Sequence, residues 1–288
     1  MDNLLSYFYY KIKITLSILS ITLIVVLFIS IYQASTSYAK KSSIKSNAQL
    51  KDNNIISIES ELLFDPNNSY LNLILGNEYI KKLDYDNALL NYNIAIEKDA
   101  ENFKAYNKRG KLRILLGDNE NAISDLNKSI KINPNFSDSY LNRAIYHSMI
   151  GKYGLVRQDL DKSIDLNPKQ YIAYELRGKE NQREGLHNEA IQDFDFSISL
   201  RPNNTSSLYY RALSYIEVRR YHHSLDDLNQ VIETHPRIVN ALILRASIYL
   251  QLGRTDKAIE DFKRILEIDK NNTKIKKELI KAKRIKRP

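Results

Sequence analysis

The sequence predicts an all-α fold, in which one helical hairpin is repeated and stacked as an α-α superhelix. The first observation behind this prediction is the spacing of the internal prolines, which are 34 residues apart or twice that distance. Proline lacks a backbone N–H and disfavours helix at the preceding residue, so it marks where a helix ends. A fixed period of this length indicates a copied supersecondary unit. The five prolines are Pro66, Pro134, Pro168, Pro202 and Pro236.

The second observation is that small and bulky residues also recur every 34 residues, and we call this register the repeat frame. One small series begins with Gly76 and Gly110, a second begins with Ala88 and Ala122, and a bulky series begins with Tyr92. Within one unit the apolar positions are three or four residues apart, as on one face of a helix, and the alternation typical of a strand is absent. Each unit is therefore predicted to be a helical hairpin whose small residues let its two helices approach closely.

A glycine between the two predicted helices of four units is the third observation. Glycine tolerates the left-handed backbone conformation that closes a helix, so it indicates a turn at this point. The four glycines are Gly117, Gly151, Gly185 and Gly253.

The pattern resembles the tetratricopeptide repeat (TPR) family. The family signature is a large residue, a small residue four positions later, an aromatic residue, an alanine and a terminal proline. Residues 105–134 carry one clear copy and residues 173–202 carry another. The resemblance covers about residues 66–270 and implies a TPR solenoid of about six hairpins. Departures such as Asn72 and Lys270 fall in the first and last units, where capping repeats are expected to be atypical.

The repeat frame also predicts the domain boundaries. The predicted segments are an N-terminal flank (1–13), a transmembrane or signal-anchor helix (14–32), a linker (33–54), a half-repeat cap (55–68), six TPR repeats (69–270) and a basic C-terminal capping helix (271–288).

Residues 14–32 contain no charged side chain, and they predict a single membrane-spanning helix. A helix of this length spans roughly 28 Å, which is close to the hydrocarbon core of a bilayer. The alternative is a cleaved signal peptide, since small residues up to Ala39 suit a cleavage site and would leave an exported, secreted or periplasmic protein. Lysines on both sides leave the orientation open, and the repeats are expected outside the cytoplasm because the segment also resembles an export signal.

The net charge of +9 is concentrated at the C-terminal end. Residues 66–269 carry 28 basic and 28 acidic residues, whereas residues 270–288 carry nine basic residues and one acidic residue. The repeat body is therefore neutral, and the overall charge does not indicate a nucleic-acid-binding domain.

The basic tail is predicted to form a helix that caps the last repeat. Ile275, Leu279, Ala282 and Ile285 have near-helical spacing and would cover the exposed end of the stack. The alternative is that the tail binds an anionic surface, such as lipid headgroups, an acidic protein or nucleic acid. Nucleic acid is not expected, because the tail has no aromatic residue on which bases could stack. Its basic residues are Lys274, Lys276, Lys277, Lys281, Lys283, Arg284, Lys286 and Arg287.

Arginine and aspartate each form a series with the period of 34 residues. The first unit lacks both and has Leu75 and Asn91 instead, which favours ion pairs within one hairpin. The structural interpretation is that a partly buried charge needs a partner. The functional alternative is a row of ligand-binding arginines. The predicted pairs are Arg109 with Asp125, Arg143 with Asp159, Arg177 with Asp193, Arg211 with Asp227, and Arg245 with Asp261.

No motif for catalysis, a cofactor or a metal is present. The sequence has no glycine-rich phosphate loop, nucleophile elbow or paired-histidine motif, so we expect no enzyme activity and no cofactor. His147 and His187 take positions that tyrosine occupies in other repeats, which predicts packing roles. His222 and His223 are adjacent and would point about 100° apart on a helix, unlike the i, i+4 pair that suits a metal.

The resemblance implies that a partner binds the concave groove lined by the first helix of each hairpin. The mixed lining suits an extended peptide or a partner helix, with apolar anchors and a few charges. The sequence therefore predicts a membrane-anchored scaffold for protein–protein interaction, and it leaves the partner and the oligomeric state open. The candidate groove residues are Leu73, Asn77, Asn107, Lys111, Leu141, Ile145, Met149, Glu175, Lys179, Tyr209, Leu213, Ile243 and Ser247.

Overall fold

The computed structural model describes residues 44–286, and for residues 44–53 and Lys286 it describes the helical backbone only. The predicted N-terminal flank, the predicted membrane helix at 14–32, the cleavage site near Ala39 and Arg287 therefore lie outside the described residues. None of the helices from 44 to 286 combines the length and apolar character that a membrane span requires.

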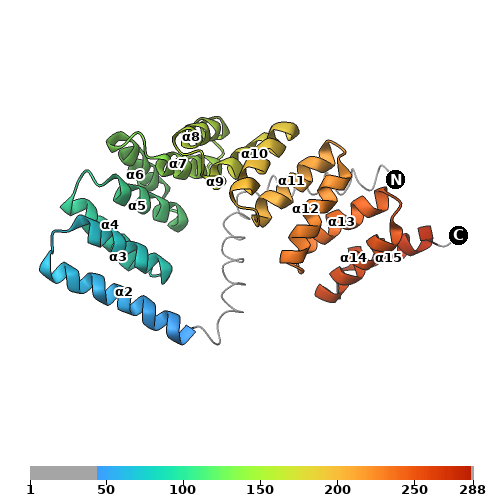
Figure 1. Cartoon of the computed structure of the whole chain (residues 1–288), viewed down its shortest axis with the longest axis horizontal. Coiled ribbons are helices and arrows are strands. Elements are labelled where there is room, and N and C mark those ends of the chain that lie inside the picture. Colours follow the sequence, from blue (N-terminus) through green and yellow to red (C-terminus); the bar gives the residue numbers. More distant parts are fainter. Residues whose placement is uncertain (1–43, 287–288) are drawn as a thin grey trace. The chain divides into compact units, whose positions relative to one another are not determined.

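Over residues 44–286 the secondary structure is entirely α-helical, which confirms the predicted fold class (Figure 1). Each hairpin of the predicted frame consists of two helices of 13 or 14 residues. The helices are α2 (Ile44–Phe64), α3 (Ser69–Lys81), α4 (Tyr85–Lys98), α5 (Phe103–Leu116), α6 (Asn119–Ile132), α7 (Ser137–Met149), α8 (Tyr153–Leu166), α9 (Tyr171–Arg183), α10 (His187–Leu200), α11 (Thr205–Glu217), α12 (Tyr221–Thr234), α13 (Val239–Gln251), α14 (Thr255–Ile268) and α15 (Thr273–Lys286).

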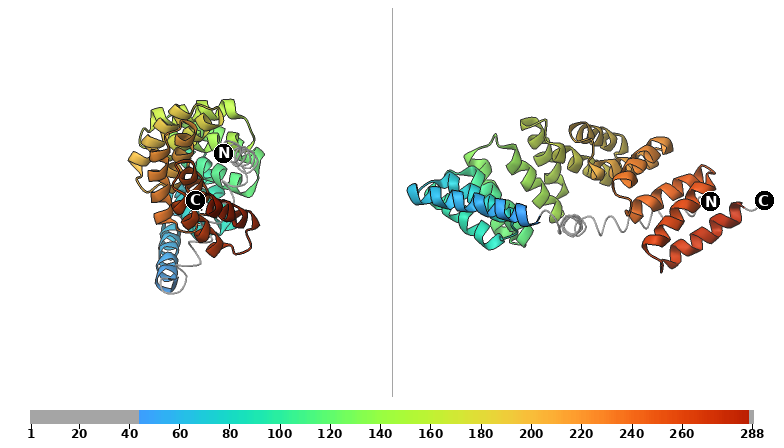
Figure 2. Two further views of the ribbon diagram at one scale, coloured as in Figure 1. Left: turned by 90° about the vertical axis from the view of Figure 1, so that its right-hand side faces the viewer. Right: turned by 60° about the horizontal axis from the view of Figure 1, so that its bottom comes forward.

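The chain divides into two compact units, Met1–Asn167 and Pro168–Pro288. The first unit contains α2 and the hairpins α3–α4, α5–α6 and α7–α8, and consecutive helices pack against one another. The second unit contains the hairpins α9–α10, α11–α12 and α13–α14, followed by α15 against α14. Within each unit the helices lie side by side, as Figure 2 shows. Contacts between α5 and α7, and between α9 and α11, bring the first helices of neighbouring hairpins together.

The hairpins close at a residue with a left-handed backbone. Gly117 has φ of 79° after α5, and its N–H donates to the carbonyl of Ile114 at 3.1 Å. Gly151, Gly185 and Gly253 also have positive φ. In the two remaining hairpins, Leu83 and Arg219 adopt this conformation with φ of 62° and 57°. The turn geometry is therefore the same in every described hairpin, although glycine occupies the turn in only four of the six.

The bulky series forms the centre of each hairpin. Its six members are at most 3% exposed: Tyr92, Leu126, Leu160, Phe194, Leu228 and Phe262. Glycine or alanine opposite them lets the helices cross closely. A Cβ placed on Gly178 would lie 2.8 Å from Cε1 of Phe194, which itself is fully buried.

We expect Gly178→Ala to destabilise the second unit by about 1–3 kcal/mol, because the added methyl group overpacks the hairpin. Gly154→Ala is the matched control, since apart from the adjoining residues and backbone of its own helix no atom lies within 4 Å of a Cβ placed on this glycine. The control should be neutral or stabilise by up to about 1 kcal/mol, because alanine restricts the unfolded chain. Chemical denaturation followed by far-UV circular dichroism measures both, and equal effects of the two variants would contradict the close-contact explanation.

The boundaries differ from the prediction at both ends of the repeats. The linker was expected to extend to Asn54, but residues 44–54 belong to α2, which has neither proline nor glycine to interrupt it. α2 packs on α3, with Ile55 only 6% exposed and a hydrogen bond from Tyr79 Oη to Glu59 Oε1. At the other end α15 begins at Thr273, where the Asn272 side chain accepts a hydrogen bond from the Ile275 N–H.

Candidate partner-binding surface

The arginines of the first helices bind the aspartates of their own hairpins. Arg109 donates from Nε and Nη2 to the two oxygens of Asp125, at 2.9 and 2.6 Å. The aspartate side chains are only 2–7% exposed, so each buried carboxylate has a bidentate cationic partner. The Nη2–Oδ1 distances are 2.6 Å for Arg109–Asp125, 2.7 Å for Arg143–Asp159, 2.7 Å for Arg177–Asp193, 2.6 Å for Arg211–Asp227 and 2.6 Å for Arg245–Asp261.

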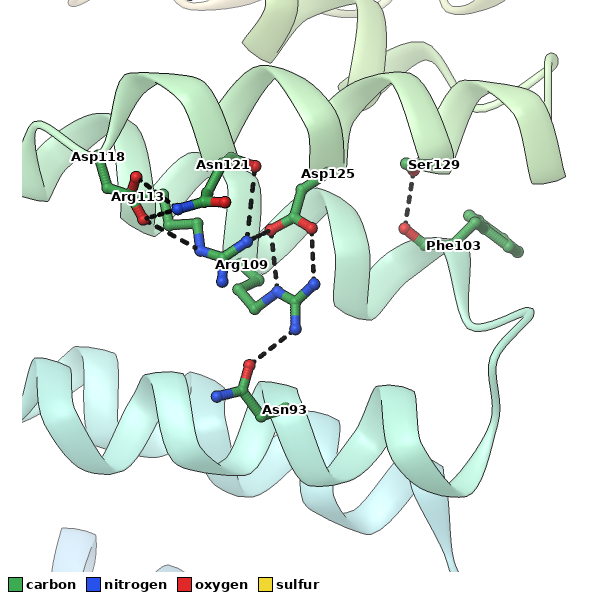
Figure 3. A network of polar contacts seen from close by, with 8 residues as sticks. All are labelled: Asn93, Phe103, Arg109, Arg113, Asp118, Asn121, Asp125 and Ser129. Carbon is green, nitrogen blue, oxygen red and sulfur yellow. Dashed lines mark hydrogen bonds and ion pairs between the residues drawn. The ribbon is translucent and has the colours of Figure 1, made fainter.

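The same arginines also join neighbouring hairpins, a contact that the sequence analysis missed. Nη1 of Arg109 in α5 donates to Oδ1 of Asn93 in α4 at 2.7 Å (Figure 3). The equivalent acceptors of Arg143, Arg211 and Arg245 lie on the second helix of the preceding hairpin. These acceptors recur with the period of 34 residues, and that spacing was the available signal: Asn127 at 2.8 Å, Asp195 at 2.5 Å and Asn229 at 2.7 Å.

Asp125 has a second cationic partner. Arg113 Nη1 donates to Asp125 Oδ2 at 2.7 Å and its Nε lies 3.6 Å from Asp118 (Figure 3). The guanidinium of Arg109 also lies 5.5 Å from the ring centroid of Tyr106. These arginines are therefore engaged within the protein, and the arrangement supports their structural role over a row of free ligand-binding arginines.

Four of the predicted groove residues are buried and unavailable to a partner. Leu73, Asn107, Leu141 and Leu213 are 4%, 1%, 6% and 8% exposed. Leu73 belongs to the core cluster of the first hairpin, and Asn107 Oδ1 accepts a hydrogen bond from Asn142 at 2.9 Å. The burial of these four side chains could not be predicted from the 34-residue spacing alone.

Three further candidates are partly exposed but make contacts within their own unit. Asn77 accepts a hydrogen bond from the Tyr92 hydroxyl at 2.9 Å. Met149 packs against the cluster formed by Ile114, Ala122 and Leu126. Ser247 Oγ donates to the carbonyl of Ile243 one turn earlier in its helix, at 2.9 Å. Each of these three side chains therefore already makes one contact within its own unit.

Glu175 and Lys179 form an ion pair on α9, at 2.5 Å. Lys179 also donates to Ser206 Oγ at 3.1 Å and lies 4.4 Å from the ring centroid of Tyr210, both on α11. Glu175 accepts hydrogen bonds from Ser206 Oγ and from Asn204 Nδ2. The cluster therefore connects two first helices, and the i, i+4 spacing of its charges on one helix could have predicted the pair.

The charges of this cluster shift the pKa of both ionic groups away from neutrality. Burial alone would raise the pKa of Glu175, but the Lys179 ammonium and the hydrogen bonds from Asn204 and Ser206 outweigh it and hold that pKa below 4.5. Burial likewise opposes the charged form of Lys179, and Glu175 overcomes it, so that the pKa of Lys179 is raised. Both groups are charged at neutral pH and balance each other.

The remaining candidates are Lys111 and Ile145 in the first unit, and Tyr209 and Ile243 in the second. Lys111 is exposed, and the other three are half-buried. Tyr209 lies on α11 with its ring edge-on to Tyr210 at a centroid distance of 5.6 Å, and burial raises the pKa of its hydroxyl. Ile243 has the same repeat position on the next first helix, α13. We call Tyr209, Ile243 and the Glu175–Lys179 pair the first-helix surface of the second unit.

His147 and His187 are at least partly buried, whereas the adjacent pair His222 and His223 is not. His147 is 9% exposed, its Nε2 is 3.7 Å from Asp159, and burial lowers its pKa. His187 is half-buried near Glu217, whereas His222 and His223 are exposed. From residue 44 to residue 286, no cluster of histidine and acidic residues has the arrangement of a metal site.

The basic tail forms the helix α15. Ile275 and Ala282 are each 1% exposed and lie on the side that packs against α14, with Leu279 half-buried. Ile285, which the sequence placed in this apolar stripe, is 61% exposed because it lies at the end of the helix. The basic residues with described side chains are all exposed: Lys274, Lys276, Lys277, Lys281, Lys283 and Arg284.

Three models of the tetratricopeptide repeat family match the sequence. The matched segments are residues 103–136, 126–158 and 239–272. No curated protein in the comparison matches the sequence.

Solved structures share the fold at low sequence identity. A chain of the APC/C hetero-tetramer Cut9-Hcn1 is similar with a TM-score of 0.65 and 18% identity, over 81% of this chain and 46% of that one. PilF of Pseudomonas aeruginosa has a TM-score of 0.67 and 14% identity, over 74% and 97%. YrrB, described as a TPR protein with an unusual peptide-binding site, has a TM-score of 0.50 and 18% identity, over 64% and 95%. The chain thus spans about half the length of the first of these structures and nearly all of the other two.

Proposed function

Because the chain is a tetratricopeptide repeat protein, we propose that it is a scaffold that binds a protein or peptide partner through the first helices of its hairpins. In this proposal the protein has no catalytic activity of its own. Fold alone does not specify a partner, so the choice of partner depends on the residues of the surface.

The observation that carries the proposal is the first-helix surface of the second unit. Tyr209 and Ile243 keep part of their area exposed at equivalent positions of α11 and α13. The neighbouring charges of Glu175 and Lys179 neutralise each other at 2.5 Å. Tyr209 contacts Tyr210, which borders this neutral cluster, and Ile243 has the equivalent position on α13. Such a tyrosine and isoleucine suit the binding of a peptide or a partner helix through apolar anchors. The peptide-binding site named for YrrB supports this use of the fold by analogy.

The proposal includes a membrane location. Its support is the uncharged stretch at 14–32, which is long enough to cross a bilayer once and lies outside the described residues. The repeats would then lie outside the cytoplasm, and cleavage near Ala39 would instead release them as an exported protein. Protease accessibility of the repeats in intact cells distinguishes these locations from a cytoplasmic one.

Affinity capture from membranes tests the binding proposal. We expect the full chain with Tyr209→Ala and Ile243→Ala to lose about tenfold or more in partner affinity, because anchor residues each contribute more than about 1 kcal/mol. Leu213 is left unchanged because it is buried.

The matched control replaces apolar residues that are exposed on second helices, Leu155 and Leu200, which are 41% and 40% exposed. Leu155→Ala with Leu200→Ala should retain binding. Equal recovery of the partner by both double variants would exclude the first-helix surface as the binding site.

A further inference from the structure

The helix α15 has an outward face that none of its packing contacts uses. Ile275 and Ala282 are each 1% exposed on the side toward α14. Residues on the opposite side are spaced so that they are neighbours on the helix surface. We call this side the basic face, and it consists of Lys276, Lys277, Ile280, Lys283 and Arg284, all exposed.

The basic face lacks a neutralising carboxylate from its own helix. Glu278 is the only acidic residue in α15, and it is 6% exposed on the packed side. Its carboxylate forms an ion pair with Lys281 Nζ at 2.9 Å. The basic face therefore presents to the solvent the positive charges of Lys276, Lys277, Lys283 and Arg284.

An apolar side chain stands among these charges. Ile280 is 52% exposed, and Ile285 at the end of the helix is 61% exposed. A helix that caps a repeat stack for solubility would gain from a polar residue at position 280. An isoleucine surrounded by cations instead matches an interface that is anionic at its surface and apolar beneath it.

We propose that the basic face of α15 binds the surface of a lipid bilayer that contains anionic lipid. Lysine and arginine attract anionic headgroups, and Ile280 enters the boundary between headgroups and acyl chains. Nucleic acid would satisfy the charges but offers no place for Ile280, and the face has no aromatic residue for base stacking. A second copy of the same face would be repelled by its like charge. This proposal goes beyond partner binding, because it uses none of the first-helix surface.

The experiment must separate this contact from the predicted membrane helix. The full chain is reconstituted in nanodiscs of phosphatidylcholine, so that the predicted membrane segment at 14–32 already has its lipid. Sedimentation with added vesicles of phosphatidylcholine, with or without phosphatidylglycerol, then measures a second, separate membrane contact. We expect the nanodiscs to bind the vesicles that contain phosphatidylglycerol and not those of phosphatidylcholine alone.

Two variants test the two components of the face. Changing Lys276, Lys277, Lys283 and Arg284 to glutamine should weaken vesicle binding by about 100-fold or more, because each basic residue near an anionic surface contributes about fivefold. Ile280→Ser should weaken vesicle binding by about three- to tenfold, because the exposed half of the isoleucine would no longer be available for burial in the bilayer. The matched control changes four exposed lysines elsewhere to glutamine, namely Lys128, Lys131, Lys162 and Lys263.

Each outcome decides for or against the bilayer. Binding that is lost only in the four-residue variant of α15, and reduced in Ile280→Ser, supports the proposal. The proposal is overturned if the four-residue variant, shown by circular dichroism to be folded, binds the vesicles as well as the lysine control does. It is also overturned if vesicles without anionic lipid bind equally. Tighter binding of duplex RNA or DNA, with no effect of Ile280→Ser, would assign the face to nucleic acid instead.

Discussion

Asp125→Ala is expected to destabilise the first unit by about 3–5 kcal/mol, the cost of leaving a buried cation without its partner. The Asp125 side chain is 4% exposed and binds both Arg109 and Arg113 at 2.6 and 2.7 Å. Those arginines are themselves only 14% and 20% exposed, so they cannot turn fully to water. Chemical denaturation and hydrogen exchange of α5 and α6 measure the loss.

The first hairpin supplies a control for this prediction. Leu75 and Asn91 occupy the positions of the arginine and aspartate there, and they are 4% and 6% exposed. Asn91 Nδ2 donates a hydrogen bond to the carbonyl of Asn87, within its own helix, at 2.8 Å. Transferring this pair as Arg109→Leu with Asp125→Asn should cost less, about 1–3 kcal/mol, because Arg109 is removed together with its partner and Arg113 keeps Asp118 at 3.6 Å. If the double variant lost as much stability as Asp125→Ala, the uncompensated charge would not be the cause.

The repeat frame was sufficient to predict the hairpins and their ion pairs. Arg109 and Asp125 are 16 residues apart in one unit, and the absence of both from the first unit linked them. The bond from Arg109 to Asn93 was not predicted: the 34-residue recurrence of its acceptor marks a polar position, but the contact itself depends on how the next hairpin stacks. The geometry of stacking is a tertiary property that spacing alone does not encode.

Exposure of the candidate binding surface was also beyond the sequence. Leu73, Asn107 and Leu141 share one repeat position with Tyr209 and Ile243, yet the first three are buried and the last two are half-exposed. Equivalent positions differ in exposure because their contacts differ, as the hydrogen bond between Asn107 and Asn142 illustrates. The frame therefore located the first helices but could not select the residues available to a partner.

Glu175→Ala is expected to destabilise the second unit by about 2–4 kcal/mol, since it leaves Lys179 with hydrogen bonds but no counter-charge. The two side chains are only 13% and 19% exposed. The ring of Tyr210 offers Lys179 a weaker cation–π contact at 4.4 Å, and Ser206 keeps its bond at 3.1 Å. Thermal unfolding compared with wild type measures the difference.

The pH dependence of stability identifies the cause. Although burial opposes it, the Lys179 ammonium holds the pKa of Glu175 below its ordinary value of 4.5. A group with a lowered pKa in the folded state stabilises the protein above that ordinary value, and the contribution is lost as the pH falls. The stability difference between wild type and Glu175→Ala should therefore shrink on acidification from neutral pH to below 4.5. A difference that stayed constant would mean that lost packing, not lost charge, explains the effect.

A double variant separates this structural role from partner binding. Glu175→Met with Lys179→Met removes both charges and keeps much of the side-chain volume, so it should be more stable than Glu175→Ala. If Tyr209 and Ile243 anchor the partner, as we propose, the double variant will still bind it. If the folded double variant loses binding instead, the charges of α9 contact the partner directly, and the ion pair must open to receive it.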